Sequence, residues 1–278
     1  MVGDVIDDVV VIPHGPLRTD TDTRSSIRSV PGGSAANTAA WLAYLGGTVD
    51  FYGVVAAADV QRHERLLLPA RAHLVGHPEL PTGTIVLIID GQRRTMLTER
   101  GANAALDLDA IPDDAIGRHL HLTGYSLFEA RDDGAAFARL IARARELGST
   151  VSVTPGSAGF IADFGVDRFR DRVAGATVLF PNLDEGRLLT GLDDPAAVCA
   201  ALDFPVVALT MGAGGVRAGG QLVPAVPATV VDPTGAGDAF AAGFLLEWVS
   251  SGAVVDAARA GARAAASAVG IIGGRPPA

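Results

Sequence analysis

Short apolar segments alternate with amphipathic ones over most of the chain, and this rhythm predicts strands followed by helices. The strands are apolar along their whole length, which is typical of a parallel sheet covered on both faces. The sequence therefore predicts an α/β domain with helices on both sides of a mostly parallel sheet. From residue 118 onward the expected strands are 119–122, 150–153, 177–180 and 206–210, and the expected helices are 132–147, 184–189, 236–250 and 254–269.

The first hundred residues depart from this rhythm. A β-branched strand is expected at 5–12, a second extended segment at 23–30, and a helix at 34–45 that stops at a glycine pair. Two further extended segments, 84–89 and 95–98, flank Asp90-Gly91, a dipeptide that supplies the positive φ angles of a tight hairpin turn. A second hairpin is expected around Gly219-Gly220, between 216–218 and 221–223.

These extended pieces predict a small β lid, formed by about 13–31 and 82–100, on a single domain that spans 1–278. Apolar residues occupy both alternating faces of 85–89, so one face can cover a site while the other meets a second lid or the main domain. We therefore expect a homodimer through the lids.

The first strand is short on its N-terminal side. Only Met1 and Val2 precede Gly3, whereas a central strand normally has about five or six residues. We expect the natural chain to begin upstream of Met1.

Composition excludes several classes of function. All 22 basic residues among the 278 are arginines, so chemistry that needs a lysine amine, including the P-loop lysine and Schiff bases, is absent. The net charge of −9 opposes nucleic acid or an anionic membrane as partner and favours a small molecule. A single cysteine, Cys199, excludes disulfides within the chain, and no apolar run approaches the length that spans a bilayer. These features predict a soluble cytoplasmic protein.

The segment from Asp232 to Phe240 carries the clearest chemical pattern. Gly235 and Gly237 flank Ala236 at the start of an expected helix, where successive backbone N–H groups and the helix dipole can form an anion hole. Asp238 follows directly, and a carboxylate there can accept a hydroxyl proton while the hole stabilises a transferred phosphoryl group. In isolation, the pattern is better explained by Asp238 as an acid that the first turn of a helix favours.

A second glycine site precedes the early helix, in the run Gly32-Gly33-Ser34-Ala35-Ala36-Asn37. With both sites present in this order, the chain resembles the ribokinase-like (PfkB) family of carbohydrate and nucleoside kinases, whose signatures are an early GGxxxN and a late D[TP]TGAGD[AS]F. Asn182-Leu183-Asp184-Glu185 resembles the family's NxxE motif, and the stretch from Thr210 to Gly215 resembles its TxGxxG segment. The four motifs cover almost the whole chain, and the resemblance implies the ribokinase-like three-layer α/β/α fold.

The resemblance implies that Asp238 is the catalytic base and that Gly235, Ala236 and Gly237 stabilise the γ-phosphoryl group of ATP. It also implies that Thr210, Gly212, Gly215 and Asn182 contact the nucleotide, and that Asn182 and Glu185 hold a hydrated Mg²⁺. A monovalent cation such as K⁺ is a further possible cofactor. For Asn182 and Glu185 there is a structural alternative, because the two residues also have the spacing of a helix capping box.

For the acceptor, the resemblance implies a sugar site. Family members place an aspartate five residues after a glycine against sugar hydroxyls, and Asp8 follows Gly3 at this spacing. Gly32, Gly33 and Asn37 would complete hydroxyl recognition, and Arg100 and Asn103 belong to a segment that resembles the family's GAN motif. The alternatives are a solvated strand end for Asp8 and an ordinary surface charge for Arg100.

The activity implied is ATP-dependent phosphorylation of a primary hydroxyl of a small sugar of ribose, ketohexose or sugar-acid type. A nucleoside kinase of adenosine or pseudouridine type is the first alternative, although 5% aromatic content leaves few residues to stack a base. A non-catalytic sugar or nucleotide sensor of the same fold is the second. A Rossmann oxidoreductase is disfavoured, because no GxGxxG follows the first strand.

Overall fold

The computed structural model describes residues 1–278 apart from 91–92, 129, 131 and 278. The strands are β1 (Ile6–Pro13), β2 (Ser25–Gly32), β3 (Asp50–Ala56), β4 (Arg71–His77), β5 (Gly83–Asp90), β6 (Arg93–Glu99), β7 (His119–Thr123), β8 (Thr150–Thr154), β9 (Val178–Leu179), β10 (Val206–Thr210), β11 (Val216–Ala218) and β12 (Gln221–Val223). The α-helices are α1 (Ser34–Tyr44), α2 (Val60–Leu67), α3 (Tyr125–Phe128), α4 (Ala135–Glu146), α5 (Ala158–Phe164), α6 (Val166–Val173), α7 (Leu183–Thr190), α8 (Pro195–Ala201), α9 (Ala236–Ser251) and α10 (Val254–Ala268).

A central sheet runs in the order β12-β11-β10-β9-β8-β7. Val2 continues this sheet, because it forms parallel bridges to Leu122 of β7 on one side and to Tyr52 of β3 on the other. β4 pairs with β3 and forms the far edge. All neighbours from β10 to β4 are parallel, and only β11 and β12 at the edge are antiparallel. β11 and β12 pair antiparallel across Gly219-Gly220, whose φ angles are 56° and 73°, so the hairpin expected there is confirmed.

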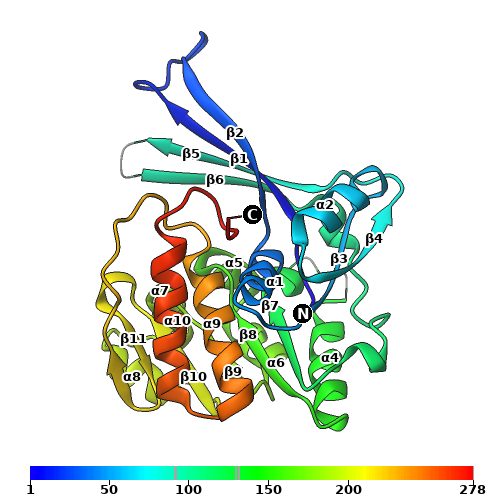
Figure 1. The fold of residues 1–278 in the computed structure, drawn as a ribbon, viewed down its shortest axis with the longest axis vertical. Helices are drawn as coiled ribbons and strands as arrows, with labels where there is room; N and C mark the ends of the chain where they lie inside the picture. Colours follow the sequence, from blue (N-terminus) through cyan, green and yellow to red (C-terminus); the bar gives the residue numbers. More distant parts are fainter. Residues whose placement is uncertain (91–92, 129, 131, 278) are drawn as a thin grey trace.

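Helices cover the two faces of this sheet (Figure 1), and each layer of helices packs on the strands through a hydrophobic cluster. One cluster packs α1, α9 and α10 against the strands, and it includes Trp41, Phe240 and Phe244. The other packs α4 to α8 against the opposite face. The three-layer α/β/α fold expected from the sequence is thereby confirmed. Within the described ranges, no helix has the length and apolar run that crossing a bilayer requires.

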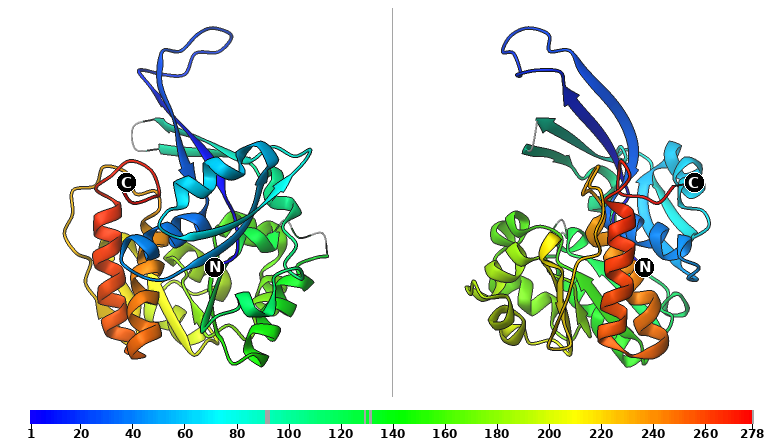
Figure 2. Two further views of the ribbon diagram at one scale, coloured as in Figure 1. Left: turned by 45° about the vertical axis from the view of Figure 1, so that its right-hand side comes forward. Right: turned by 60° about the vertical axis from the view of Figure 1, so that its left-hand side comes forward.

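The lid is a separate four-stranded sheet in the order β2-β1-β5-β6. β1 is antiparallel to β2 and parallel to β5, and β5 forms the expected hairpin with β6. Figure 2 shows β1 and β2 projecting away from the helical body. The Gly91 half of the expected Asp90-Gly91 turn lies outside the described residues, and Asp90 itself pairs with Arg93 at the end of the ladder.

The structure corrects the place of the first strand. β1 belongs to the lid rather than to the central sheet, so the lid sheet includes residues 6–13 as well as the two segments expected from the sequence. Asp8 accordingly lies inside β1, not at the end of a core strand. The sequence interpretation also missed β3, α2 and β4, which cover 50–77 and complete the far edge of the central sheet.

Candidate active site

The first turns of α1 and α9 meet beneath the lid, and they bring the two glycine motifs together. The Asp238 carboxylate accepts hydrogen bonds from Ser34 Oγ at 2.6 Å and from Asn37 Nδ2 at 3.0 Å. Ser34 and Asn37 belong to α1, whereas Asp238 lies in the first turn of α9. Two side chains of the early glycine motif therefore fix the orientation of the Asp238 carboxylate. An acid that only stabilised the start of a helix would not need these two bonds.

The N-terminus of α1 is anchored by a buried carboxylate rather than by its own cap residue. Asp4 is 2% exposed and accepts from the backbone N–H groups of Ser34 and Ala35, both at 3.1 Å, and from Thr123 Oγ1 at 3.2 Å. Gly33, the cap residue, has φ of 91°, and a Cβ there would lie 2.5 Å from the Asp4 carbonyl oxygen. This close approach requires glycine at position 33.

The loop that leads into α9 is shaped by the C-terminal segment. Asp232 accepts from the backbone N–H groups of Thr234 at 2.9 Å and Gly273 at 3.0 Å. Gly235 has φ of 75°, and a Cβ on it would lie 2.5 Å from Gly274 Cα, whereas nothing lies within 4 Å of a Cβ on Gly237. The backbone conformation of this loop at the start of α9 is therefore supported by the C-terminal segment at Gly273 and Gly274.

A small cavity lies between the lid and this floor, and we call it the lid chamber. Its volume is 120 Å³, and its roof consists of Ile85, Leu87 and Met96 from one face of the lid sheet. Its other lining residues are Asp4, Asp8, Gly33, Ser34, Asn37, Arg100, Tyr125, Thr234, Gly235 and Asp238. An apolar roof over a carboxylate-rich floor suits a polyhydroxylated molecule of small size.

The residues expected to bind the acceptor separate into two groups. Asp8, Gly33, Asn37 and Arg100 line the lid chamber. Asp8 and Arg100 are 8% and 7% exposed, so the alternative readings of a solvated strand end and a surface charge are both wrong.

Gly32 and Asn103 do not line the lid chamber. Asn103 Nδ2 donates to the carbonyls of Val5 and Arg100, and its Oδ1 accepts from Val5 N–H, so the amide fixes β1 to the segment after the lid hairpin. Gly32 leaves space for Asp8, because a Cβ there would lie 2.2 Å from Asp8 Oδ2. Asn103 therefore supports the backbone around the site, and Gly32 leaves room for the Asp8 side chain.

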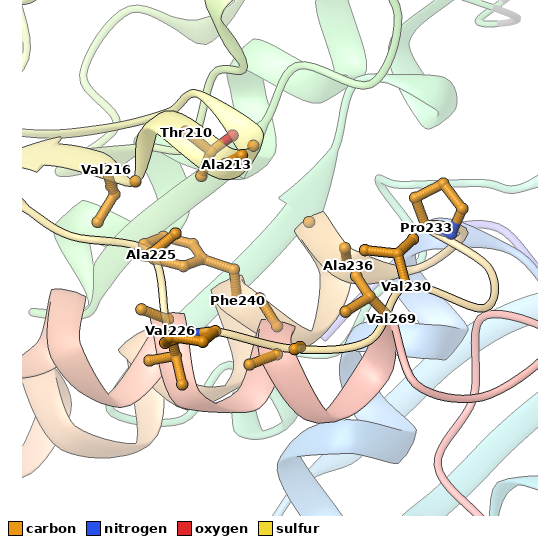
Figure 3. A pocket seen from close by; sticks show the side chains of 18 residues that line it. Thr210, Ala213, Val216, Ala225, Val226, Val230, Pro233, Ala236, Phe240 and Val269 are labelled. Atoms are coloured by element: carbon orange, nitrogen blue, oxygen red, sulfur yellow. The ribbon is translucent and has the colours of Figure 1, made fainter.

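A larger apolar cavity of 590 Å³ opens on the other side of the loop 233–237, which was expected to form an anion hole (Figure 3). Thr210, Gly212 and Gly215 line it together with Phe240 and Val269, whereas Asn182, the fourth residue expected to contact the nucleotide, lines a different cavity. Its size and apolar walls fit a nucleobase and ribose. Ala236 and Gly237 also line it, so the start of α9 forms part of its wall.

A junction chamber of 180 Å³ joins these two spaces, and its lining includes Asp238, Gly237, Thr210, Asn182 and Glu185. The capping box expected of the last two is confirmed: Asn182 Oδ1 accepts from Glu185 N–H and Glu185 Oε2 accepts from Asn182 N–H, both at 2.9 Å. The described residues contain no cluster of three or more His, Cys, Asp or Glu able to hold a metal. Glu185 Oε1 remains for a ligand, which fits a divalent ion that keeps most of its water.

Three carboxyl groups of the site, those of Asp238, Asp8 and Glu185, have pKa values raised to about 7. Burial raises the pKa of Asp238 to about 7, against the opposing effect of its hydrogen bonds from Ser34 and Asn37. Burial, with the charge of Asp4, raises the pKa of Asp8 to about 7, and burial raises that of Glu185 to about 7. A base with such a pKa can accept a proton and release it again near physiological pH.

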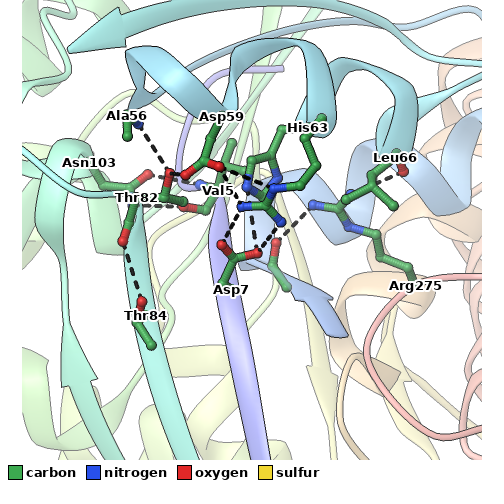
Figure 4. A network of polar contacts seen from close by, with 12 residues as sticks. Val5, Asp7, Ala56, Asp59, His63, Leu66, Thr82, Thr84, Asn103 and Arg275 are labelled. Carbon is green, nitrogen blue, oxygen red and sulfur yellow. Dashed lines mark hydrogen bonds and ion pairs between the residues drawn. The ribbon is translucent and has the colours of Figure 1, made fainter. Parts of the chain in front are cut away.

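A polar network fastens the base of the lid to the body (Figure 4). Arg62 of α2 donates two hydrogen bonds to Asp7 of β1, and Asp59 accepts from Thr82, just before β5. Arg275 donates to the carbonyls of Leu66 and Gly32, so the C-terminal segment holds α2 and the end of β2 together. This network fixes the lid strand that carries Asp8.

Sequence reasoning did not identify Ser34 or Arg275 as residues that support the site, whereas the apolar lid face over it was expected from 85–89. The serine directly after Gly33 was the available signal for Ser34, because a hydroxyl at a helix start can reach a neighbouring carboxylate. Arg275 lies among glycines and prolines that read only as a loop.

Comparison with known proteins agrees with this geometry. The profile of the family described as "pfkB family carbohydrate kinase" matches residues 1–278. An ATP-dependent ribose-1-phosphate kinase from Halopiger xanaduensis is 34% identical over 84% of this chain and 80% of that protein. A fructokinase from Klebsiella pneumoniae is 31% identical over 81% of this chain and 78% of that protein. The adenosine kinase structure from Sinorhizobium meliloti superposes with a TM-score of 0.85 at 24% identity, covering 100% of this chain and 95% of that chain.

A three-layer α/β/α fold with a buried, hydrogen-bonded carboxylate between two cavities is that of a small-molecule kinase. The chain belongs to the PfkB family of carbohydrate kinases. Membership implies ATP as the phosphoryl donor, used together with a divalent metal ion.

The pKa of Asp238 leads to a prediction for the pH dependence of activity. The prediction takes Asp238 as the catalytic base expected from the sequence, which must be ionised to accept a proton. The value of kcat/KM should then rise from pH 5.5 to 8.5 with an inflection near 7, to which the interacting carboxylates of Asp238 and Asp8 both contribute. Ser34→Ala removes a hydrogen bond that lowers the Asp238 pKa and should shift the inflection to higher pH. A profile that is flat between pH 6 and 8 contradicts this assignment.

Proposed function

We propose that this protein transfers the γ-phosphoryl group of ATP to a primary hydroxyl of a small sugar of ribose, ketohexose or sugar-acid type. The observation that carries the proposal is the position of Asp238, which lines both the lid chamber and the junction chamber. A hydroxyl in the lid chamber therefore meets the base on one side and the anion-hole loop on the other.

The reaction follows from these positions. Asp238 accepts the hydroxyl proton as the hydroxyl oxygen forms its bond to the γ-phosphorus, and the bond from that phosphorus to the β,γ-bridging oxygen breaks to release ADP. The backbone N–H groups around Gly235, Ala236 and Gly237 stabilise the charge on the transferred group, which needs no lysine. We propose Mg²⁺ as the divalent ion; when bound it neutralises phosphate charge, and Glu185 and Asn182 would hold its water shell.

The size of the lid chamber supports a sugar over a nucleoside. At 120 Å³ it is well below the range of about 300–1,000 Å³ that is usual for drug-sized ligands. Relatives are named for both acceptor types, including fructokinases, a ribose-1-phosphate kinase and, among solved structures, adenosine and nucleoside kinases.

ATP consumption against a panel of sugars, sugar acids, sugar phosphates and nucleosides tests the proposal. The experiment is run with Mg²⁺, with and without K⁺, and product is identified by mass. Rapid transfer to one or more sugar-type acceptors is expected. Selective transfer to a nucleoside would favour the alternative acceptor, and ligand binding without transfer would favour a non-catalytic sensor.

We also propose a homodimer formed through the outer face of the lid. The strand registers place Val9, Val11, Val86 and Ile88 on the face away from the lid chamber, with Ile27 and Leu97 beside them. Ile27 and Leu97 are 65% and 57% exposed. An apolar sheet face of this kind favours burial against a second copy of itself.

Sedimentation velocity at micromolar concentration should therefore give a dimer, and the double substitution Ile27→Arg and Leu97→Arg should give a monomer. Leu68→Arg is a matched control, because Leu68 is 70% exposed but lies outside the lid. A monomeric unsubstituted protein would refute this proposal.

A further inference from the structure

The Arg100 guanidinium is buried without a hydrogen-bond partner. Its side chain is 7% exposed, and Nε, Nη1 and Nη2 all lack a partner within the described residues. The ring of Tyr125 lies 4.9 Å from its Cζ and covers one face of the cation, while the Tyr125 hydroxyl is held by the Gly156 carbonyl. The N–H groups at the edge of the guanidinium plane remain to be satisfied.

The acids near Arg100 do not meet this need. Asp4 is the one carboxylate within ion-pair range among the described residues, and its closest oxygen is 3.6 Å from Arg100 Nη2. Its oxygens already accept from the Ser34 and Ala35 N–H groups and from Thr123. Asp238 is held by Ser34 and Asn37. Buried N–H donors without acceptors are costly even when a carboxylate lies 3.6 Å away, so acceptors must come from what enters the site.

Arg100 lines the lid chamber, which it shares with Asp8, Asn37 and Asp238. The group that reaches Arg100 is therefore part of the acceptor rather than of the nucleotide, whose cavity has other walls. A guanidinium matches the paired oxygens of a phosphate or carboxylate, with hydrogen bonds roughly twice as strong as those to neutral groups. A sugar hydroxyl offers no compensating charge.

We infer that Arg100 recognises an anionic substituent, a phosphate or a carboxylate, on the sugar acceptor. The inference rests on the proposed function and narrows it: the acceptor is a sugar phosphate or a sugar acid rather than a neutral sugar. Asp8 and Asn37 contact hydroxyls, Asp238 takes the proton of the attacking hydroxyl, and Arg100 holds the charged end of the same molecule.

The first test compares charged and neutral acceptors in matched pairs: ribose 1-phosphate with ribose, and gluconate with glucose. At least one anionic member should exceed its neutral partner by tenfold or more in kcat/KM, and the pair that shows this distinguishes phosphate from carboxylate. Efficient transfer to neutral sugars alone would overturn the inference and leave the proposed function standing. If no acceptor is phosphorylated, the proposed function fails, and calorimetric titration with the same four compounds decides whether Arg100 still selects anions.

The second test uses Arg100→Gln, with Arg100→Lys for partial rescue and Arg170→Gln, an exposed arginine of α6, as a control for lost charge. The ratio of kcat/KM for the anionic acceptor to that for its neutral partner should fall by about 10- to 100-fold in Arg100→Gln, mainly through KM. Arg100→Lys should recover part of it, and Arg170→Gln should not change it.

Two results would overturn the inference. An equal loss with both acceptors would mean that Arg100 only supports the fold through Tyr125 and Asp4. A weakened Kd for ATP with an unchanged acceptor ratio would place its partner on the donor phosphate. Both measurements are made on the full chain, and thermal unfolding verifies that each variant is folded.

Discussion

Asp238→Asn is expected to lower kcat by about 10²- to 10⁴-fold while the Kd for ATP changes little. The carboxylate lies between the two chambers and is oriented by Ser34 and Asn37, so its contribution is made mainly when the hydroxyl proton moves. Asparagine keeps the shape of the side chain but cannot accept this proton. Steady-state kinetics with the identified acceptor and calorimetric titration with ATP separate the two effects.

Thermal unfolding at pH 8 controls for damage to the fold. Because burial raises the Asp238 pKa to about 7, its ionised form is disfavoured in the folded protein, and stability from the protonated form declines as pH rises through 7. A neutral asparagine should therefore leave Tm unchanged or raise it at pH 8. Near-normal phosphoryl transfer by a folded Asp238→Asn protein would return Asp238 to the role of a helix-start acid.

Gly235→Ala is expected to reduce both stability and activity. Alanine at φ of 75° costs about 1–2 kcal/mol, and its Cβ would press on the Gly274 backbone at 2.5 Å, so the anion-hole loop or the C-terminal segment must move. Loss of one oxyanion donor typically costs about 10²- to 10³-fold in kcat. We expect this loss together with a Tm lowered by roughly 5 °C, measured by calorimetry.

Gly237→Ala is the matched variant two residues away. A Cβ at Gly237 has no neighbour within 4 Å, so Tm should be unchanged, while activity should still fall because the methyl group enters the space of the phosphates. Equal Tm values for the two alanine variants would contradict the role assigned to the Gly274 contact.

Local signals were sufficient to predict the elements that carry the catalytic residues. Helix 236–250 was predicted from its glycine start and apolar content, and the structure has α9 at Ala236–Ser251. Strand 206–210 matches β10, and the capping box of Asn182 and Glu185 follows from residue types at fixed spacing. These features depend on neighbours along the chain, which a single sequence displays.

Features that depend on distant partners were not predictable. Segment 5–12 is apolar enough for either sheet, and only its parallel pairing with β5 places it in the lid. Arg100 and Asn103 belong to one short turn, yet one side chain enters the lid chamber and the other bonds to the backbone of Val5. Sequence spacing gives no direction for side chains in such a turn.

The hydrogen bond from Ser34 to Asp238 joins residues that are 204 positions apart in the chain. Closing so long a loop costs conformational entropy before the contact can stabilise the fold, and long-range contacts of this kind slow folding. During refolding from denaturant, the helices can therefore form well before the two glycine motifs meet. Recovery of phosphoryl transfer then reports the completion of folding, whereas circular dichroism reports an earlier stage.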